Sequence, residues 1–469
     1  MKNMSSGPLR RSYVRRSCSK VGLCVLLLWL GARPAAGLAP HELLVLANRH
    51  EPASVRIAQT YLRERSIPRQ NLVLLSLPPD DAGDYVSISR ENYTRQIWEP
   101  VQTALRLRGL EHVLAWVFST HLPYRVDGDP PVSVQGLTFV RNQLPSREAI
   151  AKAEYESPLF AGPSAPNRGM RLSHSLFPAS QALGADMPIP SMALGYIGPR
   201  GNREDEVLAM LARSRSADAS APSGTVYFVE HEDDIRSQVR AWQFAPVAAM
   251  LQRMGVEAVI TNEVPVGASA VLGVMLGARE VDPSSMGVFL PGAVGEHLTS
   301  FGATFDLAAQ TKISRWIAAG VSGTAGTVTE PYAVWAKFPH ARFYVHYRSG
   351  ATLLESFYLS VRTPLQTFLL GDPLTAPWAP AAHLRIAGLE EGEVVATARS
   401  IDIHIQAPYG THYSRFQYLI NGRVVGDGTS FVLDPTVLPP GLHVLRAVAY
   451  RAGHIQSPVF GEVRFQIAP

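Results

Sequence analysis

The chain has 469 residues, of which 46% are hydrophobic and 17% charged, and its formal net charge is +4. The first 37 residues hold seven of the 43 Lys and Arg residues and no Asp or Glu, so the remainder has 36 basic against 39 acidic residues. No basic run follows Gly37, and a nucleic-acid-binding face needs concentrated positive charge. We therefore expect no nucleic-acid partner.

Residues 1–37 have the pattern of a secretory signal peptide. Basic residues precede the apolar run from Val21 to Leu30, and Ala35-Ala36-Gly37 suits signal peptidase. The run is about half of the ~20 residues that a membrane span needs, although an uncleaved N-terminal anchor remains an alternative. We expect an exported protein, periplasmic or extracellular, without a stable transmembrane anchor.

Both cysteines of the chain, Cys18 and Cys24, lie in this predicted leader. After export the protein would have no thiol. This excludes disulfides, cysteine metal sites and thiolate catalysis together.

Residues 38–378 predict an α/β domain. Short apolar runs predict strands buried on both faces, and segments with helical periodicity separate them. The alternation implies right-handed crossovers and a mostly parallel sheet flanked by helices. The predicted strands are residues 43–46, 72–75, 113–118, 192–197, 226–229, 256–260, 271–276 and 287–290, and the predicted helices are residues 52–62, 89–107, 203–213, 235–254, 307–319 and 341–361.

Two segments depart from this alternation. Residues 121–190 are rich in Pro, Gly, Ser and Asn and predict an irregular insertion, a lid over one edge of the sheet. Residues 379–383 predict a linker.

Residues 384–469 predict a small all-β sandwich. Ile401, Ile403 and Ile405 alternate with polar residues, and Asn421-Gly422 predicts a hairpin turn. This part resembles bacterial immunoglobulin-like modules in Leu419-Ile420-Asn421-Gly422 and Leu438-Pro439-Pro440-Gly441.

Candidate site residues follow the predicted strands, because open α/β sheets bind ligands beyond the carboxyl ends of their strands. Four segments have this position: residues 119–121, 291–302, 320–331 and 370–373. They supply the predicted binding residues Glu296, His297, Thr299, Ser300, Thr324, Glu330 and Asp372.

A serine-type hydrolytic site is one interpretation of these residues. His297 would be the base, Ser300 the nucleophile, and Glu330 or Asp372 the group that orients the histidine. Ser300 lacks the Gly-x-Ser-x-Gly elbow, and the sequence favours the simpler interpretation that Glu296 and His297 cap or support a short helix after the strand.

His121, directly after a predicted strand, is a further candidate base or a loop residue bonded to backbone. Glu330 is expected to be held extended by Pro331, and Asp372 to form a turn.

Cofactor motifs are missing from the sequence. There is no His-Glu-x-x-His and no Asp/His cluster with ligand spacing, which predicts no metal site. Gly320, Gly323 and Gly326 match neither a Walker loop nor Gly-x-Gly-x-x-Gly, so we expect no nucleotide, nicotinamide or other cofactor.

Most of residues 40–378 resembles a widespread family of exported bacterial proteins, a resemblance that implies no particular activity. Its hallmarks correspond here to Pro291-Gly292-Ala293, residues 296–302, Trp316, residues 319–323, Gly326-Thr327-Val328 and Glu330-Pro331.

The order of elements is distantly similar to gingipain-type peptidases of the caspase-like fold. Leu370-Gly371-Asp372-Pro373 fits a motif of that family. Its catalytic histidine would fall near Leu276-Gly277-Ala278 and its cysteine near Leu290-Pro291-Gly292, and neither residue is present. The resemblance therefore implies the scaffold without the Cys/His dyad.

The sequence as a whole favours an exported protein whose caspase-like domain is not a peptidase and binds a peptide, glycan or envelope partner around residues 296–302. A hydrolase with the Ser/His/Glu site is the alternative. A third possibility is a structural protein of the envelope, with the β-sandwich as a spacer.

Overall fold

The structure is a computed structural model that describes residues 38–163 and 187–468. All of these residues belong to one compact unit of the chain. The predicted signal peptide and the central part of the predicted lid, residues 164–186, lie outside the described residues.

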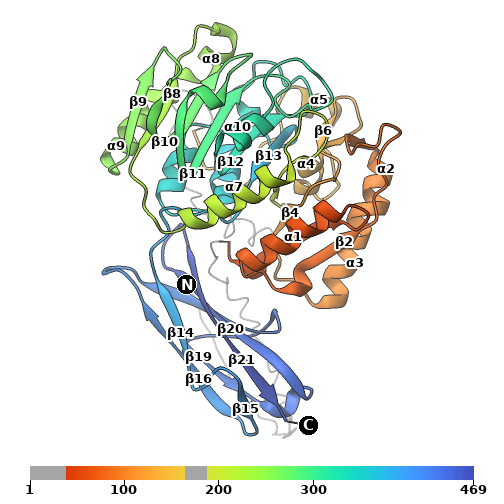
Figure 1. The fold of residues 1–469 in the computed structure, drawn as a ribbon, viewed down its shortest axis with the longest axis vertical. Coiled ribbons are helices and arrows are strands. Elements are labelled where there is room, and N and C mark those ends of the chain that lie inside the picture. The colour runs from red at the N-terminus through yellow and green to blue at the C-terminus, as the bar shows by residue number, and fades with distance from the viewer. Residues whose placement is uncertain (1–37, 164–186, 469) are drawn as a thin grey trace, which may run out of the picture. The chain divides into compact units, whose positions relative to one another are not determined.

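A ten-stranded, mostly parallel sheet forms the centre of residues 38–378, which we call the α/β part (Figure 1). Its strand order is β2-β1-β4-β7-β13-β12-β11-β10-β8-β9, and β12 and β13 are antiparallel. The strands are β1 (Leu43–Asn48), β2 (Leu72–Leu75), β4 (Ala115–Phe118), β7 (Ser191–Ala193), β8 (Thr225–Val229), β9 (Glu257–Thr261), β10 (Ala268–Gly277), β11 (Gly287–Leu298), β12 (Gly323–Thr327) and β13 (Thr367–Gly371).

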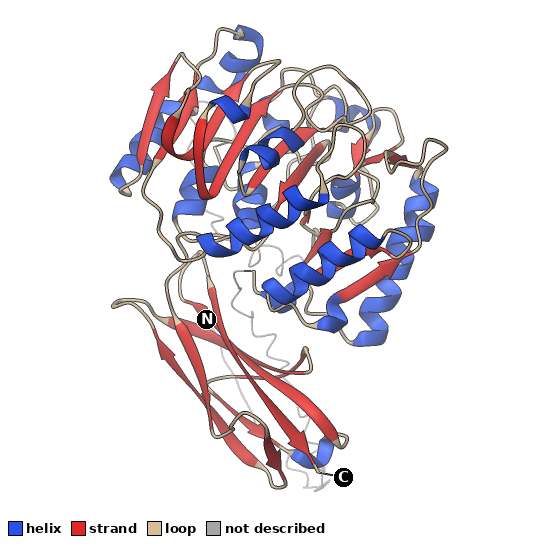
Figure 2. Ribbon diagram, in the orientation of Figure 1, coloured by secondary structure: helices blue, strands red, loops and turns tan. Residues whose placement is uncertain are grey.

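Helices alternate with these strands, as Figure 2 shows. Ser89 is the N-cap of the helix that begins at Arg90, because its hydroxyl accepts a hydrogen bond from Asn92 N (3.1 Å). The helices are α1 (Pro52–Glu64), α2 (Arg90–Tyr93), α3 (Glu99–Arg108), α4 (Val134–Phe139), α5 (Arg147–Ala151), α7 (Glu204–Ala217), α8 (Asp234–Ala241), α9 (Phe244–Arg253), α10 (Ser314–Ala319), α11 (Phe343–Arg348) and α12 (Leu353–Ser360).

Two glycines show how helices approach opposite faces of the sheet. A Cβ on Gly295 would lie 2.0 Å from Trp316 of α10, and one on Gly273 would lie 2.3 Å from Tyr344 of α11. In the β10–β11 register Gly273 lies opposite Val294 and Val274 opposite Gly295. Because successive strand residues point to opposite faces, α10 and α11 cover opposite faces of the sheet.

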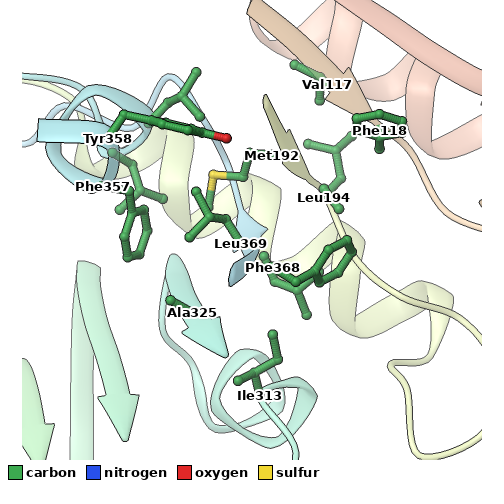
Figure 3. Packing of buried hydrophobic residues seen from close by; sticks show 14 of the residues in the cluster. Val117, Phe118, Met192, Leu194, Ile313, Ala325, Phe357, Tyr358, Phe368 and Leu369 are labelled. Atoms are coloured by element: carbon green, nitrogen blue, oxygen red, sulfur yellow. The ribbon is translucent and has the colours of Figure 1, made fainter. Parts of the chain in front are cut away.

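The hydrophobic core lies between the sheet and these helices. Figure 3 shows side chains of β4, β7, β12 and β13 in this core, with Tyr358 of α12 beside Met192. Tyr358 Oη also donates to Ser191 O (2.9 Å), which satisfies the phenol inside the core.

The structure has strands and helices in the predicted alternation, but several of the predicted boundaries were wrong. β11 continues to Leu298 instead of ending at residue 290, and β12 occupies residues 323–327, which the sequence predicted as a loop. The predicted helix over residues 235–254 is two helices, because Pro246 in the first turn of α9 has no N–H for a bond to the preceding helix.

The predicted irregular insertion also contains regular structure. It holds α4, α5 and the strands β5 (Arg125–Val126) and β6 (Val132–Ser133), which form a small sheet with β3 (Ser87–Ile88) from outside the insertion. The insertion is therefore only partly irregular.

Residues 383–467, which we call the β part, form two smaller, mostly antiparallel sheets. One has the order β14-β16-β19 and the other β15-β21-β20-β17-β18. Asn421 and Gly422 have φ of 51° and 80°, as the predicted hairpin turn requires. The strands are β14 (His383–Ala387), β15 (Glu393–Val395), β16 (Arg399–Gln406), β17 (Tyr413–Ile420), β18 (Arg423–Asp427), β19 (Ser430–Leu433), β20 (Gly441–Arg451) and β21 (Pro458–Ile467).

Candidate functional site

Four loops that follow strands of the large sheet meet and form the candidate site. They follow β4 (residues 119–124), β7 (194–203), β11 (299–313) and β12 (328–335), and we call them the strand-end loops. Hydrogen bonds join the loop after β11 to each of the other three. Ligands of α/β proteins bind at such loops.

Ser300 joins the loops after β11 and β12. Its hydroxyl donates to Glu330 Oε1 (3.0 Å), and the same oxygen accepts the N–H of Tyr332 (2.8 Å). Thr327 Oγ1 donates to Ser300 O (2.9 Å). No described residue donates a hydrogen bond to the other carboxylate oxygen, Glu330 Oε2, so this oxygen is a free acceptor at a half-buried position.

The loop after β11 is held rigid by Gln310 and Lys312. Gln310 Oε1 accepts from Thr299 Oγ1 and from Phe301 N, both at 2.7 Å. Lys312 Nζ donates to Phe301 O (2.8 Å) and to Ala309 O (2.6 Å), and burial lowers the pKa of Lys312 to about 8. These bonds fix the loop without help from a ligand.

Asp306 joins the loop after β11 to the chain after β4. It accepts hydrogen bonds from Tyr124 Oη and from Arg125 Nη2 (3.1 Å). Burial acts to raise the pKa of Asp306, but these two bonds outweigh it and hold the pKa below its usual value. Arg200, from the loop after β7, donates to Phe305 O (3.1 Å). The loop after β7 therefore contacts the loop after β11 next to Asp306.

Each strand-end loop contains one residue other than glycine with a left-handed backbone. The φ angles are 54° at His121, 54° at Arg200, 66° at Gln310 and 56° at Tyr332. This conformation costs energy for residues with a side chain and concentrates at active sites and ligand clamps. Of the eleven such residues in the described part of the chain, four lie on these loops, one on each.

His297 lies inside the core and not at these loops. Trp316 Nε1 donates to His297 Nδ1 (2.9 Å), and His297 Nε2 donates to Thr311 O (3.2 Å). Burial lowers the pKa of His297 to about 3. Both ring nitrogens are occupied and the imidazole is neutral, so His297 has no contact with Ser300 through which it could act as a base.

Glu296 faces the other side of the sheet, since it precedes His297 in the same strand. It forms a fully buried ion pair with Arg240 of α8. Burial raises the pKa of Glu296 to about 7, although Arg240 acts in the opposite direction. Glu296 and His297 therefore lie in the core, where His297 accepts a hydrogen bond from Trp316 of the short helix α10, as the second interpretation of the sequence allowed.

His121 lies in a separate polar group at the ends of β1 and β4. Its Nδ1 is 3.2 Å from Thr120 Oγ1, its Nε2 is 3.8 Å from Glu51 Oε2, and Tyr85 Oη donates to Glu51 Oε1 (2.8 Å). Burial lowers the pKa of His121 more than Glu51 raises it. Asn48, fully buried, donates to His121 O (3.2 Å) and holds the loop.

Asp372 and Thr324 are both buried. Asp372 accepts from Tyr61 Oη (3.0 Å) and from Arg65 Nε (2.7 Å) near the C-terminus of α1, whereas Glu51 lies at its N-terminus. A helix of this length spans about 20 Å, so Asp372 lies far from the group around His121. Thr324 Oγ1 has no hydrogen-bond partner among the described residues.

The structure thus brings Thr299, Ser300 and Glu330 together and separates them from Glu296, His297 and Asp372. Sequence reasoning missed Gln310, Asp306 and Tyr332, because no sequence motif marks the hydrogen bonds that they make. The loops after β11 and β12 were indicated by their positions alone.

Two general features concern metals and membranes. Within residues 38–163 and 187–468, no group of three or more His, Cys, Asp or Glu side chains lies close enough to hold a metal ion. None of the helices in this described part of the chain has the length and apolar character needed to cross a membrane.

Comparisons with known proteins identify no family. No protein-family description and no curated protein sequence matches the chain. Solved structures with some similarity include fibronectin(III)-like modules of CbhA from Clostridium thermocellum (16% identity, 18% of this chain and 96% of that chain, TM-score 0.16). Others are CopC from Methylosinus trichosporium OB3b (19%, 19% and 94%, 0.14) and an endo-beta-1,4-mannanase from Thermotoga petrophila (9%, 79% and 83%, 0.17). TM-scores this low carry no argument about function.

Proposed function

We propose that this protein is an exported, non-peptidase protein of caspase-like fold that binds an envelope glycan at its strand-end loops. The observation that carries the proposal is the strained residue on each of the four loops, because rigid, strained loops favour a preformed ligand site. The β part, interpreted as an immunoglobulin-like module, would be an accessory domain.

The chemistry of the loops favours a ligand rich in hydrogen-bond donors. Glu330 Oε2 and the carboxylate of Asp306 are acceptors at accessible positions. Tyr332, two residues from Glu330, is 66% exposed, and its ring provides a flat apolar surface. Sugar hydroxyls suit such acceptors and a sugar face suits the ring, so we favour a glycan over a peptide.

Two features of the described residues favour binding as the proposal. No described residue is a cysteine. The Ser300 hydroxyl donates to a carboxylate, and the imidazole of His297 is neutral and bonded on both nitrogens. A nucleophilic serine normally donates to the base that activates it.

Binding is tested with two defined probes and the purified protein. We expect the tetramer of β-1,4-linked N-acetylglucosamine to bind in isothermal titration more tightly than a peptidoglycan stem peptide. Glu330→Ala and Tyr332→Ala should each weaken the sugar at least tenfold, about 1.4 kcal/mol. Glu263→Ala, at an exposed glutamate outside the strand-end loops, is the matched control and should bind normally.

Preference for the stem peptide, reduced by the same variants, would reassign the ligand to peptides. Failure of the loop variants to change any binding would overturn the proposal.

The hydrolase alternative keeps one supporting observation, the 3.0 Å contact between Ser300 and Glu330. In that case a carboxylate would accept the serine proton directly. A fluorophosphonate probe separates the two functions. Covalent labelling that disappears in Ser300→Ala would establish a hydrolase, and we expect no labelling.

A further inference from the structure

A large crevice outside the strand-end loops is lined by cationic and amide side chains. It lies between the connection from α1 to β2 (residues 65–71) and the strands β20 and β21, and its volume is about 1100 Å³. Four arginines line it, Arg63, Arg69, Arg446 and Arg464, against one carboxylate, Glu462. Such an excess of positive charge attracts anions.

Arg446 is the buried member of this group. Its side chain is 5% exposed, its Nη2 lies 2.7 Å from Glu462 Oε1, and it also donates to Ser66 O. Its Nη1 is buried and has no hydrogen-bond partner among the described residues. Burial lowers the pKa of Arg446 although Glu462 acts to raise it, so the single carboxylate does not fully compensate the buried cation.

A second donor in the wall is also unsatisfied. Gln70 Nε2 is buried without a hydrogen-bond partner in the described part of the chain. Arg446 and Gln70 thus both have donor capacity that the described residues leave unused, and an anion supplies acceptors for such groups.

The remaining arginines stand at the rim. Arg63 lies 3.7 Å from Glu64 and Arg464 lies 3.4 Å from Glu391, and these exposed pairs stabilise little. Arg69 is exposed and has no ion-pair partner among the described residues. The rim therefore keeps its positive character.

The walls also contain apolar side chains. Ile67 and Leu62 are buried below the crevice, and Leu442 is 63% exposed at its edge. An exposed leucine beside cationic groups suits a ligand that has an apolar body in addition to its charge.

We infer that this crevice binds a small organic anion, with a carboxylate or phosphate group at the wall formed by Arg446 and Gln70 and a short apolar body against Leu442. The two head groups share the same acceptor chemistry. Arginine favours both because its planar fork matches their oxygens.

Isothermal titration of the purified protein with four probes tests the inference. The probes are inorganic phosphate, acetate, hexyl phosphate and hexanoate. We expect one of the two hexyl compounds to bind at least tenfold more tightly than its head group alone, and the preferred head group identifies the source of the anion. Binding should weaken as salt rises.

Variants locate the site. Arg446→Met should abolish binding, and because Arg446 also bonds to Ser66, the exposed variant Arg69→Glu provides a second test that leaves the fold intact. We expect Arg69→Glu to weaken binding at least fivefold. Arg253→Glu, an equal charge change on α9, should have no effect.

No binding of any probe at millimolar concentration would overturn the inference. So would equal weakening by Arg69→Glu and Arg253→Glu, which would indicate general charge attraction only. Neither result would affect the proposed glycan site, which uses other residues.

Discussion

The two ends of helix α1 carry two polar groups with opposite characters. At its C-terminus Asp372, Arg65 and Tyr61 are buried, and the carboxylate accepts a hydrogen bond on each oxygen. At its N-terminus Glu51 and His121 are partly exposed, and their nitrogen–oxygen distance is 3.8 Å. A polar cluster that is buried and has its hydrogen bonds satisfied stabilises the fold, as around Asp372. A polar group that is partly exposed and has unused acceptors, as around Glu51, is available to bind a ligand.

The strand-end loops extend the second kind. In Glu330, as in Glu51, one carboxylate oxygen accepts hydrogen bonds from the protein, and the other can still accept a hydrogen bond from a ligand. If the comparison is right, changes in the first cluster affect stability and changes at the loops affect binding.

The largest expected effect is the loss of stability in Asp372→Ala. The change leaves Arg65 buried with only Asp218 as a counter-ion. Breaking a buried pair costs about 3–5 kcal/mol of unfolding free energy. Urea denaturation followed by circular dichroism measures it.

The control for this prediction is Asp427→Ala, at an exposed aspartate of β18. It should change the unfolding free energy by less than ~0.5 kcal/mol. If Asp372→Ala is as stable as this control, the cluster is not structural and the comparison fails.

A smaller effect, with a pH signature, is expected for His297→Gln. The folded-state pKa of His297 is about 3, and its unfolded value is about 6.5. Between these values the unfolded chain takes up a proton that the folded chain does not. His297 therefore contributes stability that is present above pH ~6.5 and is lost as the pH falls towards 3, by about 1.4 kcal/mol per pH unit.

Removal of this histidine should flatten the pH dependence between pH 4 and 6 and lower the stability at pH 7 by about 1–3 kcal/mol, because the Trp316 indole loses its acceptor. Urea unfolding at several pH values measures both effects. Buried glutamates such as Glu296 titrate with the opposite sign, but they cancel when variant and wild type are compared. His404→Gln, at an exposed position, should leave the profile unchanged, and an unaltered profile in His297→Gln would contradict the buried neutral state.

The sequence predicted the strands and helices better than the site, for physical reasons. Apolar runs such as residues 43–46 have only one favourable environment, the interior of a sheet. Residues 291–293 of β11 are Pro, Gly and Ala, which locally favour a turn, and only pairing within the sheet makes them a strand. Because that extension was missed, Glu296 and His297 were assigned to one loop, although alternate strand residues face opposite sides.

The strained residues were beyond prediction for another reason. The left-handed backbone accompanies side-chain bonds to Thr299 and Phe301 at Gln310 and a bond from the N–H to the Glu330 carboxylate at Tyr332, and neither residue type favours this conformation. Asn421-Gly422 shows the contrast, because there the residue types themselves favour the conformation, and the predicted turn was confirmed.

The smallest expected effect concerns the strain at Tyr332, where φ is 56°. Valine in the left-handed region costs about 1–2 kcal/mol, whereas glycine adopts it freely, so Tyr332→Gly should be more stable than Tyr332→Val. At Tyr409, which is fully exposed and has no left-handed backbone, the order should be reversed, because glycine loses more chain entropy on folding. Thermal unfolding of the four variants measures the two differences. The same order of stability at both positions would show that the backbone at Tyr332 is not strained. The proposed ligand site depends on that strain. Without it, the strand-end loops would no longer differ in kind from the buried cluster around Asp372.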